Sequence, residues 1–225
     1  MSHNLTIVIP IFNDRESLEV LTQKIEAIKD PHFQFLIVDN GSTDLGAISL
    51  IKNGGKNWSG IRTPKNLGFG GGILYGINKA DTFWVGWMPG NLKIDPLDIP
   101  EFVSKIVFSW NVVTKAKRVG RPLIPSLKTL FAGIIQSTIL QTKMIDTGGT
   151  PTVCTKDFIL GLKSPPKDYV FESFILFKAR NAGLTVQRPK INYGKRMFGQ
   201  SHWQSGFLAE LQLMQKIISS SGSWR

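Results

Sequence analysis

The stretch LTIVIPIFNDRESLEVLTQKIEAIKDPHFQFLIVD, residues 5–39, contains the pattern that decides the fold. It begins with a short β-branched apolar run, Leu5–Ile11, and ends with a second apolar run, Phe33–Val38. Both runs have the length and composition of buried strands. Between them, apolar residues recur at the spacing of one helix face: Leu18, Leu21, Ile25 and Ile28. The order strand, helix, strand predicts two parallel strands joined by a right-handed crossover.

The rest of the chain alternates in the same way. Further strands are predicted over residues 59–63, 83–87, 111–116 and 184–187, and another helix or a strand-to-helix turn over residues 154–162. Helices are predicted over residues 47–51, 70–80, 97–109, 127–140, 171–182 and 205–218, and a basic loop, KAKRVGR, over residues 115–121. We therefore expect an α/β protein with a single domain over residues 1–225, in which helices flank a Rossmann-like, mostly parallel sheet.

The composition favours a globular protein with an anionic partner. The 225 residues are 42% hydrophobic and 19% charged, and the formal net charge is +11 with a pI near 9.8. A phosphorylated small molecule and an acidic membrane surface both fit this charge, as does a solvated basic surface without any partner. No recognition motif for nucleic acid accompanies the charge, so we expect no nucleic acid partner.

Cysteine usage and the N-terminus bear on location. The single cysteine, Cys154, excludes an intrachain disulfide and fits a reducing compartment. The N-terminus lacks a basic signal region, and no apolar run approaches the length of about 18 residues that indicates a membrane span. We therefore expect a cytoplasmic protein that is soluble or peripheral, at the inner face of the membrane.

Polar residues follow the predicted strands at two places. The segment VDNGSTD, residues 38–44, offers side chains that can accept hydrogen bonds from a nucleobase or ribose, although such residues also form purely local turns. The segment FWVGWMPGNLKIDP, residues 83–96, is a strand that runs into a polar turn at mid-chain. Because ligands of open α/β sheets bind beyond the carboxyl ends of strands, we expect the functional site there.

A third segment, NLGFGGGILYG at residues 66–76, begins a helix with glycines. Glycines let the backbone approach a phosphate at a helix start, or let a helix pack closely on a sheet. The spacing fits neither the dinucleotide-binding motif nor the Walker motif. Both interpretations, phosphate binding and close packing, stay open.

Seven segments in order carry a resemblance. They are VIPIFNDRESL (8–18), IVDNGSTD (37–44), NLGFGGGILYGINKA (66–80), WMPGNLKIDP (87–96), DTGGTPTVCTKDF (146–158), FESFILFKARNAGLTV (171–186) and RMFGQSHW (196–203). Together they resemble glycosyltransferase family 2, which has the GT-A fold. The last segments look most like the branch that makes sugar derivatives of dolichol phosphate or polyprenyl phosphate.

The resemblance implies a nucleotide-binding half at about residues 1–96 and an acceptor-binding half at about residues 97–225. The residues implied to bind the nucleotide sugar are Pro10, Phe12, Asp14, Asp39, Asn40, Asn66, Gly68, Gly90 and Asn91. Glu172, Asp146 and Arg196 are the implied catalytic residues, and Ser201 and Trp203 are implied to contact the acceptor.

The resemblance also raises a question about the cofactor, because Pro89-Gly90-Asn91 falls where the family carries Asp-x-Asp. Those aspartates hold Mg²⁺ or Mn²⁺, which prefer anionic oxygen ligands. Asp95 is the one carboxylate near enough in sequence to replace them. Basic side chains offer an alternative in which no metal is needed to neutralise the diphosphate, because guanidinium groups match phosphate oxygens. The candidates are Lys93, Arg118, Arg121, Lys195 and Arg196. The sequence therefore makes no cofactor certain.

The acceptor decides whether a general base is needed. A glycan hydroxyl requires one, for which Glu172 is the first candidate and Asp146 the second, unless Glu172 is an exposed helix residue. A polyprenyl phosphate is already anionic, and the apolar helix 127–140 would then lie against the membrane, unless it belongs to the core. We expect an inverting glycosyltransferase that moves a sugar from a nucleoside-diphosphate donor to a polyprenyl phosphate or a glycan. The alternative is a catalytically inactive, transferase-like protein that binds nucleotide sugars or acts as a scaffold.

Overall fold

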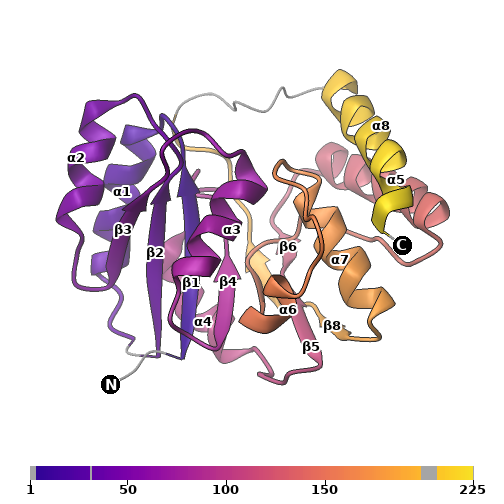
Figure 1. The fold of residues 1–225 in the computed structure, drawn as a ribbon, viewed down its shortest axis with the longest axis horizontal. Coiled ribbons are helices and arrows are strands. Elements are labelled where there is room, and N and C mark those ends of the chain that lie inside the picture. Colours follow the sequence, from indigo (N-terminus) through magenta and orange to yellow (C-terminus); the bar gives the residue numbers. More distant parts are fainter. Residues whose placement is uncertain (1–3, 31, 199–206, 225) are drawn as a thin grey trace.

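A mixed β-sheet runs through the computed structural model, which describes residues 4–30, 32–198 and 207–224. Within these residues the sheet has seven strands in the order β3-β2-β1-β4-β7-β5-β8 (Figure 1). The strands are β1 (Leu5–Ile11), β2 (Phe33–Asp39), β3 (Trp58–Arg62), β4 (Trp84–Trp87), β5 (Val112–Lys115), β7 (Thr152–Thr155) and β8 (Thr185–Gln187). All are parallel except β7, which pairs antiparallel with β4 and β5.

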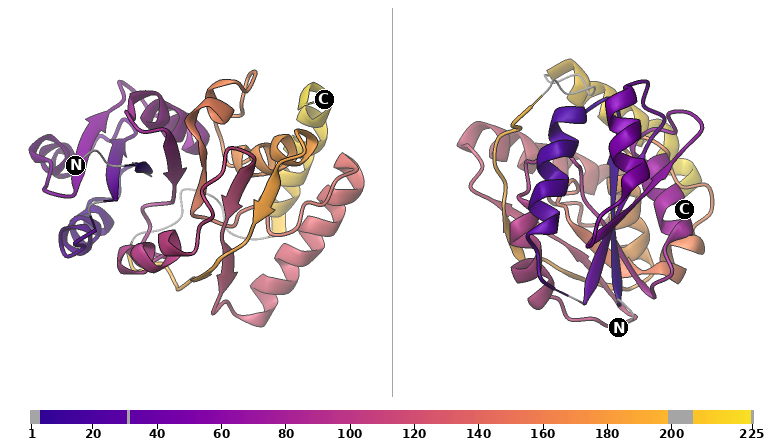
Figure 2. Two further views of the ribbon diagram at one scale, coloured as in Figure 1. Left: turned by 90° about the horizontal axis from the view of Figure 1, so that it is seen from below. Right: turned by 90° about the vertical axis from the view of Figure 1, so that its left-hand side faces the viewer.

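Helices cover both faces of the sheet, so that the molecule has three layers (Figure 2). One face carries α1 (Arg15–Glu26), α2 (Leu45–Asn53), the 3-10 turn η1 (Pro96–Asp98) and α4 (Ile99–Ser104). The other face carries α3 (Phe69–Lys79), α6 (Lys156–Leu160) and α7 (Phe171–Asn181). Two more helices, α5 (Leu123–Leu140) and α8 (Phe207–Trp224), pack against each other at the outer edge. This architecture confirms the predicted α/β class.

The burial of β1 explains why its sequence is a continuous apolar run. Ile7, Ile9 and Ile11 belong to the core under α1 and α2, whereas Val8 belongs to the core under α3. A strand covered on both faces needs apolar side chains at every position. Because β1 lies between β2 and β4, this single run contributes to both cores.

Two predictions about the second half are wrong. The helix predicted over residues 97–109 ends at Ser104, and Val107, within the predicted range, is exposed. The predicted basic loop 115–121 is partly strand: Lys115 ends β5 in full burial, and β6 (Lys117–Val119) pairs with β9 (Lys190–Asn192). Local sequence does not reveal these pairings, because the partner strands lie far along the chain.

Strand β4 ends beside the middle of β1, and this difference in length places the polar turn 89–91 next to the last residues of β1. Trp87 pairs with Val8, so β1 continues to Ile11 beside the residues that follow β4. A Cβ on Gly90 would lie 2.0 Å from Ile11 Cδ1 and 3.0 Å from Ile9 Cγ2, so glycine permits this close approach. The turn therefore crosses the carboxyl end of the sheet, as expected.

Candidate active site

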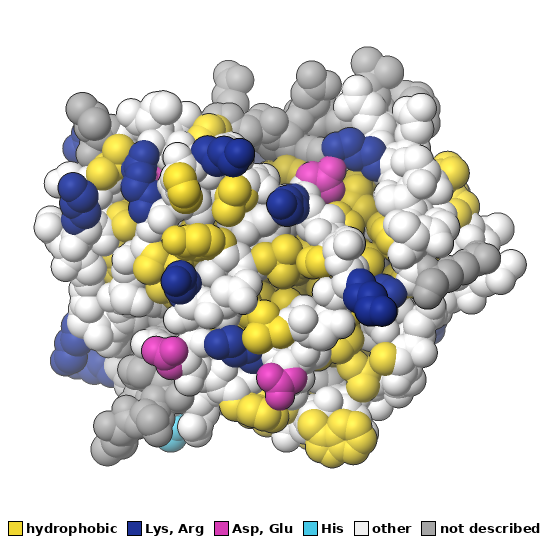
Figure 3. Space-filling model, in the orientation of Figure 1, with side chains coloured by type: hydrophobic (Ala, Val, Ile, Leu, Met, Phe, Trp, Pro, Cys, Tyr) yellow, Lys and Arg dark blue, Asp and Glu magenta, His cyan; other side chains and the backbone are white. Residues whose placement is uncertain are grey.

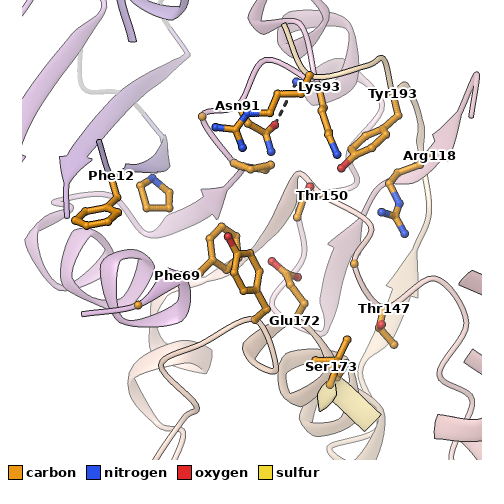
Figure 4. Close-up of a pocket in the computed structure, with 18 of the residues that line it drawn as sticks. Phe12, Phe69, Asn91, Lys93, Arg118, Thr147, Thr150, Glu172, Ser173 and Tyr193 are labelled. Atoms are coloured by element: carbon orange, nitrogen blue, oxygen red, sulfur yellow. Dashed lines mark hydrogen bonds between the residues drawn. The ribbon is translucent and has the colours of Figure 1, made fainter. Parts of the chain in front are cut away.

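A cavity of about 580 Å³ opens at the carboxyl end of the sheet. Its lining comes from the ends of β1 and β4, the start of α3, the first turn of α7 and one side of α5. Figure 4 shows Lys93 and Arg118 on either side of Tyr193, with Glu172 and Ser173 on α7 opposite them. Residues from both halves of the chain therefore meet in one cavity.

Most residues predicted to bind the nucleotide sugar line this cavity: Pro10, Phe12, Asp14, Asn40, Asn66, Gly68, Gly90 and Asn91. Asn40 organises this end of the cavity. Its Nδ2 donates to Gly68 O at 2.9 Å, and its Oδ1 accepts from Leu67 N at 3.1 Å. Gly68 has a φ of +78°, and a Cβ there would lie 2.4 Å from Lys167 O. Glycine is therefore required where α3 begins.

Asp39 lies elsewhere, contrary to its predicted place at the base and ribose. Its side chain is fully buried outside the cavity lining. Arg62 Nη1 lies 2.5 Å from Oδ2, and Ser42 N donates to Oδ1 at 2.9 Å. The carboxylate thus holds the turn after β2 and does not face the cavity.

The glycine-rich segment serves mainly for close packing. A Cβ on Gly76 would lie 2.4 Å from Val8 Cγ1 and 2.9 Å from Val38 Cγ2. At the helix start, Gly71 N–H already donates to Lys167 O at 3.0 Å, which makes it less available to a phosphate. Of the two interpretations left open, the structure supports packing of α3 on the sheet, with Gly68 alone among these glycines lining the cavity.

Cations gather on the opposite wall. Lys93 Nζ lies 5.8 Å and Arg118 Cζ 5.2 Å from the centre of the Tyr193 ring, distances typical of cation–π contacts. Asp146 accepts from Arg118 Nε at 3.0 Å and forms an ion pair with the same guanidinium. Asp146 itself is not part of the cavity lining, so it positions Arg118 and does not contact the space where an acceptor would lie.

Other predicted basic residues have different places. Arg196 lines the cavity and forms an ion pair with Asp14, another lining residue just beyond β1. Arg121 lies outside the lining and donates to Pro125 O and Thr129 Oγ1 at 3.0 and 2.9 Å. Lys195 is exposed and also outside the lining. Ser201 and Trp203 lie outside the described residues.

The residues at the expected metal position do not fit a divalent cation. Asn91 Oδ1 accepts from Lys93 N at 3.2 Å, and Asn91 supplies no anionic oxygen. Asp95 is outside the cavity lining, because its Oδ2 lies 2.5 Å from Lys24 Nζ and its Oδ1 caps η1 through Leu97 N. Within the described residues, no cluster of three or more His, Cys, Asp or Glu side chains could hold a metal ion. The suggestion that Asp95 supplies a metal ligand therefore disagrees with its position.

Glu172 lies at the base of the cavity in a buried network. Its Oε1 accepts from Trp87 Nε1 at 2.7 Å, and its Oε2 lies 2.5 Å from Lys115 Nζ. Lys115 also donates to Thr152 Oγ1 at 3.1 Å. The interpretation of Glu172 as an exposed helix residue is wrong, because Glu172 is only 6% exposed.

Helix α5 has two different faces. Lys128, Thr129, Ala132 and Gln136 line the cavity. On the opposite face, seven large apolar side chains are 43–73% exposed: Leu123, Ile124, Leu127, Leu130, Phe131, Ile134 and Ile135. These seven residues, here called the α5 apolar stripe, follow the spacing of one helix face.

The length of α5 corrects the expectation that no apolar run approaches membrane-spanning length. Its 18 residues have a mean hydropathy of 1.4, so by length and composition alone the helix could cross a membrane. A core helix of a soluble protein would also meet this criterion, but only 17% of α5 is buried. The apolar run was not recognised in the sequence because Lys128 and the serine and threonine residues of α5 interrupt it.

Sequence reasoning missed three side chains of the site. Lys128 is the single charged residue of α5 and lines the cavity. Of the three, it could most easily have been found from the sequence, because a lone charge in an apolar helix suggests a specific role. Tyr193 sits just after β9, a strand that the sequence pattern did not predict. Lys115 was predicted to lie where a strand runs into a basic loop, and only the structure reveals its burial and its pairing with Glu172.

The fold is that of GT-A glycosyltransferases. Glucosyl-3-phosphoglycerate synthase from Mycobacterium tuberculosis, solved with Mn²⁺ and UDP-glucose, superposes with a TM-score of 0.74 at 15% identity, covering 99% of this chain and 79% of that one. A complex of the same enzyme with Mn²⁺, UDP-glucose and phosphoglyceric acid gives a TM-score of 0.72 at 14% identity, covering 98% and 78%. At such low identity the likeness concerns the fold alone.

The family follows from the sequence comparison. Residues 6–161 match the model of glycosyl transferase family 2, and the chain belongs to this family of glycosyltransferases. A dodecaprenyl-phosphate galacturonate synthase of Rhizobium johnstonii is 32% identical over 111 residues, which span 47% of this chain and 33% of that protein. An uncharacterized glycosyltransferase of Mycobacterium bovis is 24% identical over 200 residues, 88% of each chain. These relatives favour the enzyme over the non-catalytic alternative.

Proposed function

We propose that this glycosyltransferase moves a sugar, with inversion, from a nucleoside-diphosphate donor to a polyprenyl phosphate held at a membrane surface. One observation carries the proposal: α5 lines the cavity with one face and exposes the α5 apolar stripe on the other. A membrane lying against that stripe would be separated from the cavity only by α5, so that the phosphate of a polyprenyl lipid could reach the cavity around the helix. The glycan acceptor has no comparable feature in its favour.

The geometry of α5 favours a helix that lies on the membrane and does not span it. Its polar face contributes to the cavity through Lys128, Thr129 and Gln136, and α8 packs beside it. A helix committed to the domain on one side can offer lipid only the other side. The peripheral position at the inner face of the membrane is thus part of this proposal.

Charge supports an anionic donor and an anionic acceptor. Lys93, Arg118, Lys128 and Arg196 line the cavity, and the whole chain carries a net charge of +11. Figure 3 shows several lysine and arginine side chains, and few acidic ones, on the face of the molecule that carries α3 and α7. Charge-assisted hydrogen bonds to phosphate contribute about 1.5–3 kcal/mol each. Several of them can replace part of the effect of a cation on the leaving diphosphate.

The two halves of the chain would divide the work. The nucleotide would occupy the end lined by Phe12, Asn40 and Gly68, within residues 1–96. The acceptor phosphate would occupy the end lined by Arg118 and Lys128, within residues 97–225. The name of the Rhizobium relative gives a polyprenyl phosphate as the acceptor of that protein, which supports the choice of acceptor.

Calorimetric titration with UDP, GDP, CDP and dTDP, each with Mn²⁺ and again with EDTA, tests the donor site. We expect one nucleotide to bind, and to bind equally with EDTA. Binding that EDTA abolishes would overturn the metal-free proposal. No binding under any condition would favour the non-catalytic alternative.

Transfer from the corresponding nucleotide sugar to polyprenyl phosphate in vesicles then tests the acceptor. Lys128→Ala should raise the KM for the acceptor about tenfold, because one phosphate contact of about 1.5 kcal/mol is lost. Lys143→Ala is the matched control, because Lys143 is an exposed lysine just beyond α5 that does not line the cavity. Transfer to a glycan hydroxyl but not to the lipid phosphate would contradict the proposal.

A further inference from the structure

A buried ion pair lies under the cavity and joins two distant parts of the chain. Lys115 ends β5 and Glu172 is in the first turn of α7, and their side chains are 0% and 8% exposed. Lys115 Nζ lies 2.5 Å from Glu172 Oε2, and Trp87 Nε1 donates to Oε1 at 2.7 Å. Both carboxylate oxygens therefore have a donor.

This arrangement opposes proton uptake by Glu172. Protonation of the carboxylate would leave the Lys115 ammonium buried without a counter-ion, which is strongly unfavourable. If instead the proton of Lys115 moved onto Glu172, the carboxyl group would already carry a proton. In either form Glu172 has no capacity to take a proton from an acceptor hydroxyl.

The surroundings of Lys115 agree with this view. Burial lowers the pKa of Lys115, and the Glu172 carboxylate opposes that shift. The other charged or titratable groups that act on the pair are Arg188, Asp146 and Cys154. Arg188 disfavours the ammonium of Lys115 and Asp146 favours it, so Glu172 is the main group that keeps Lys115 charged.

We infer that Lys115 prevents Glu172 from acting as a general base, and so makes the site selective for acceptors whose attacking oxygen is already ionised. This inference rests on the proposed function. A phosphate oxygen forms the bond to the anomeric carbon, the bond from that carbon to the diphosphate breaks, and the electron pair leaves with the nucleoside diphosphate. No proton moves. A hydroxyl acceptor would in addition have to lose a proton to a base, which this site withholds.

Carboxyl-carbon NMR of ¹³C-glutamate-labelled protein tests the pair directly, with Glu172→Gln identifying the resonance. Spectra of the wild type and of Lys115→Met are compared from about pH 5 to about pH 9. In Lys115→Met the Glu172 resonance should titrate within that range, because a buried carboxyl group without a counter-ion has a raised pKa. The same pH dependence of the Glu172 resonance in Lys115→Met and in the wild type would overturn the inference.

Acceptor choice provides the second readout. Lys115→Met should raise the ratio of transfer to water or a hydroxyl over transfer to phosphate, by about 10²-fold, the low end of a general-base contribution. An unchanged ratio would contradict the inference. If Lys115→Met does not fold, the double variant Lys115→Met/Glu172→Gln keeps an acceptor for Trp87 and leaves no buried charge.

The pH profile of transfer to phosphate separates the two roles of Glu172. The profile of the double variant should have the same shape as that of the wild type. An acidic limb in the wild type that the double variant lacks would show that Glu172 is a base. Failure of the wild type to transfer to polyprenyl phosphate would contradict the proposed function, whereas the NMR titration would still decide the inference about Lys115.

Discussion

Asp39 shows how a single buried carboxylate holds a turn beside the cavity. It lies at the end of β2 with Arg62 on one oxygen and the Ser42 amide on the other. Arg62 also donates to Ser42 O at 2.7 Å, so one guanidinium fixes both ends of the turn. This turn also positions Asn40, whose side-chain amide donates to Gly68 O at the start of α3.

Replacing Arg62 should therefore destabilise the fold. Arg62→Ala leaves Asp39 buried without its charged partner, for which about 3–5 kcal/mol is typical. Because the Arg62 side chain is 38% exposed, water screens part of this effect, and we expect about 1–3 kcal/mol. Urea denaturation monitored by circular dichroism measures the change.

Arg15→Ala is the control for that measurement. Arg15 forms an exposed pair with Glu19 on α1, and its loss should leave the urea midpoint unchanged. Equal midpoints for Arg62→Ala and the wild type would show that Asp39 does not depend on Arg62.

At the scale of elements, α3 and α5 illustrate two different uses of a helix. α3 lies directly on the sheet, and Gly76 allows its backbone to approach β1 and β2. α5 lies at the periphery and has few buried residues. Helix α3 supports the core, whereas α5 lines the cavity with one face and exposes apolar side chains on the other.

Gly76→Ala should destabilise the protein by about 1–3 kcal/mol through overpacking. The added Cβ would lie 2.4 Å from Val8 Cγ1, and Val8 is fully buried and has little room to move. Thermal and urea unfolding both measure the effect. Gly222→Ala in α8 is the matched control, because nothing lies within 4 Å of its added Cβ. It should leave stability unchanged or raise it by up to about 1 kcal/mol, and a similar loss in both variants would refute the packing argument.

The α5 apolar stripe should control membrane binding. Phe131→Ser combined with Ile134→Ser removes two of its exposed apolar side chains. Burying one such side chain in lipid contributes about 1.5–3 kcal/mol, so vesicle affinity should fall at least about tenfold. Co-sedimentation with vesicles measures this affinity, and nucleotide binding should not change.

A second pair of exposed apolar residues provides the control for the stripe. Val107→Ser combined with Leu160→Ser changes residues that are 64% and 47% exposed but lie outside α5. This variant should bind vesicles as the wild type does. An equal loss in both double variants would indicate nonspecific adhesion, not docking through α5.

At the scale of the whole molecule, the net charge of +11 acts together with the apolar stripe. Binding to vesicles that contain anionic lipid should weaken markedly as salt rises from about 0.05 M to about 0.5 M, because salt screens surface charge. Binding to zwitterionic vesicles through the stripe should change little over the same range. Equal salt dependence for both kinds of vesicle would contradict this division.

The sequence by itself determined most of the elements and the end of the sheet where the site lies. Strand and helix signals are local, because side-chain periodicity depends on neighbours within a few residues. The polar turns after β2 and β4 therefore pointed to the carboxyl end of the sheet. The ordered motifs also indicated the family, which the match over residues 6–161 confirms.

Only the tertiary structure decided which side chains face the cavity and which face one another. Arg196 meets Asp14 across 182 residues, and Lys115 meets Glu172 across 57 residues. Asp39 and Asp95 turn away from the cavity to Arg62 and Lys24, although their positions after strands suggested the opposite. Ion pairing and burial depend on distances in space, and these are fixed only when the sheet and its helices pack together.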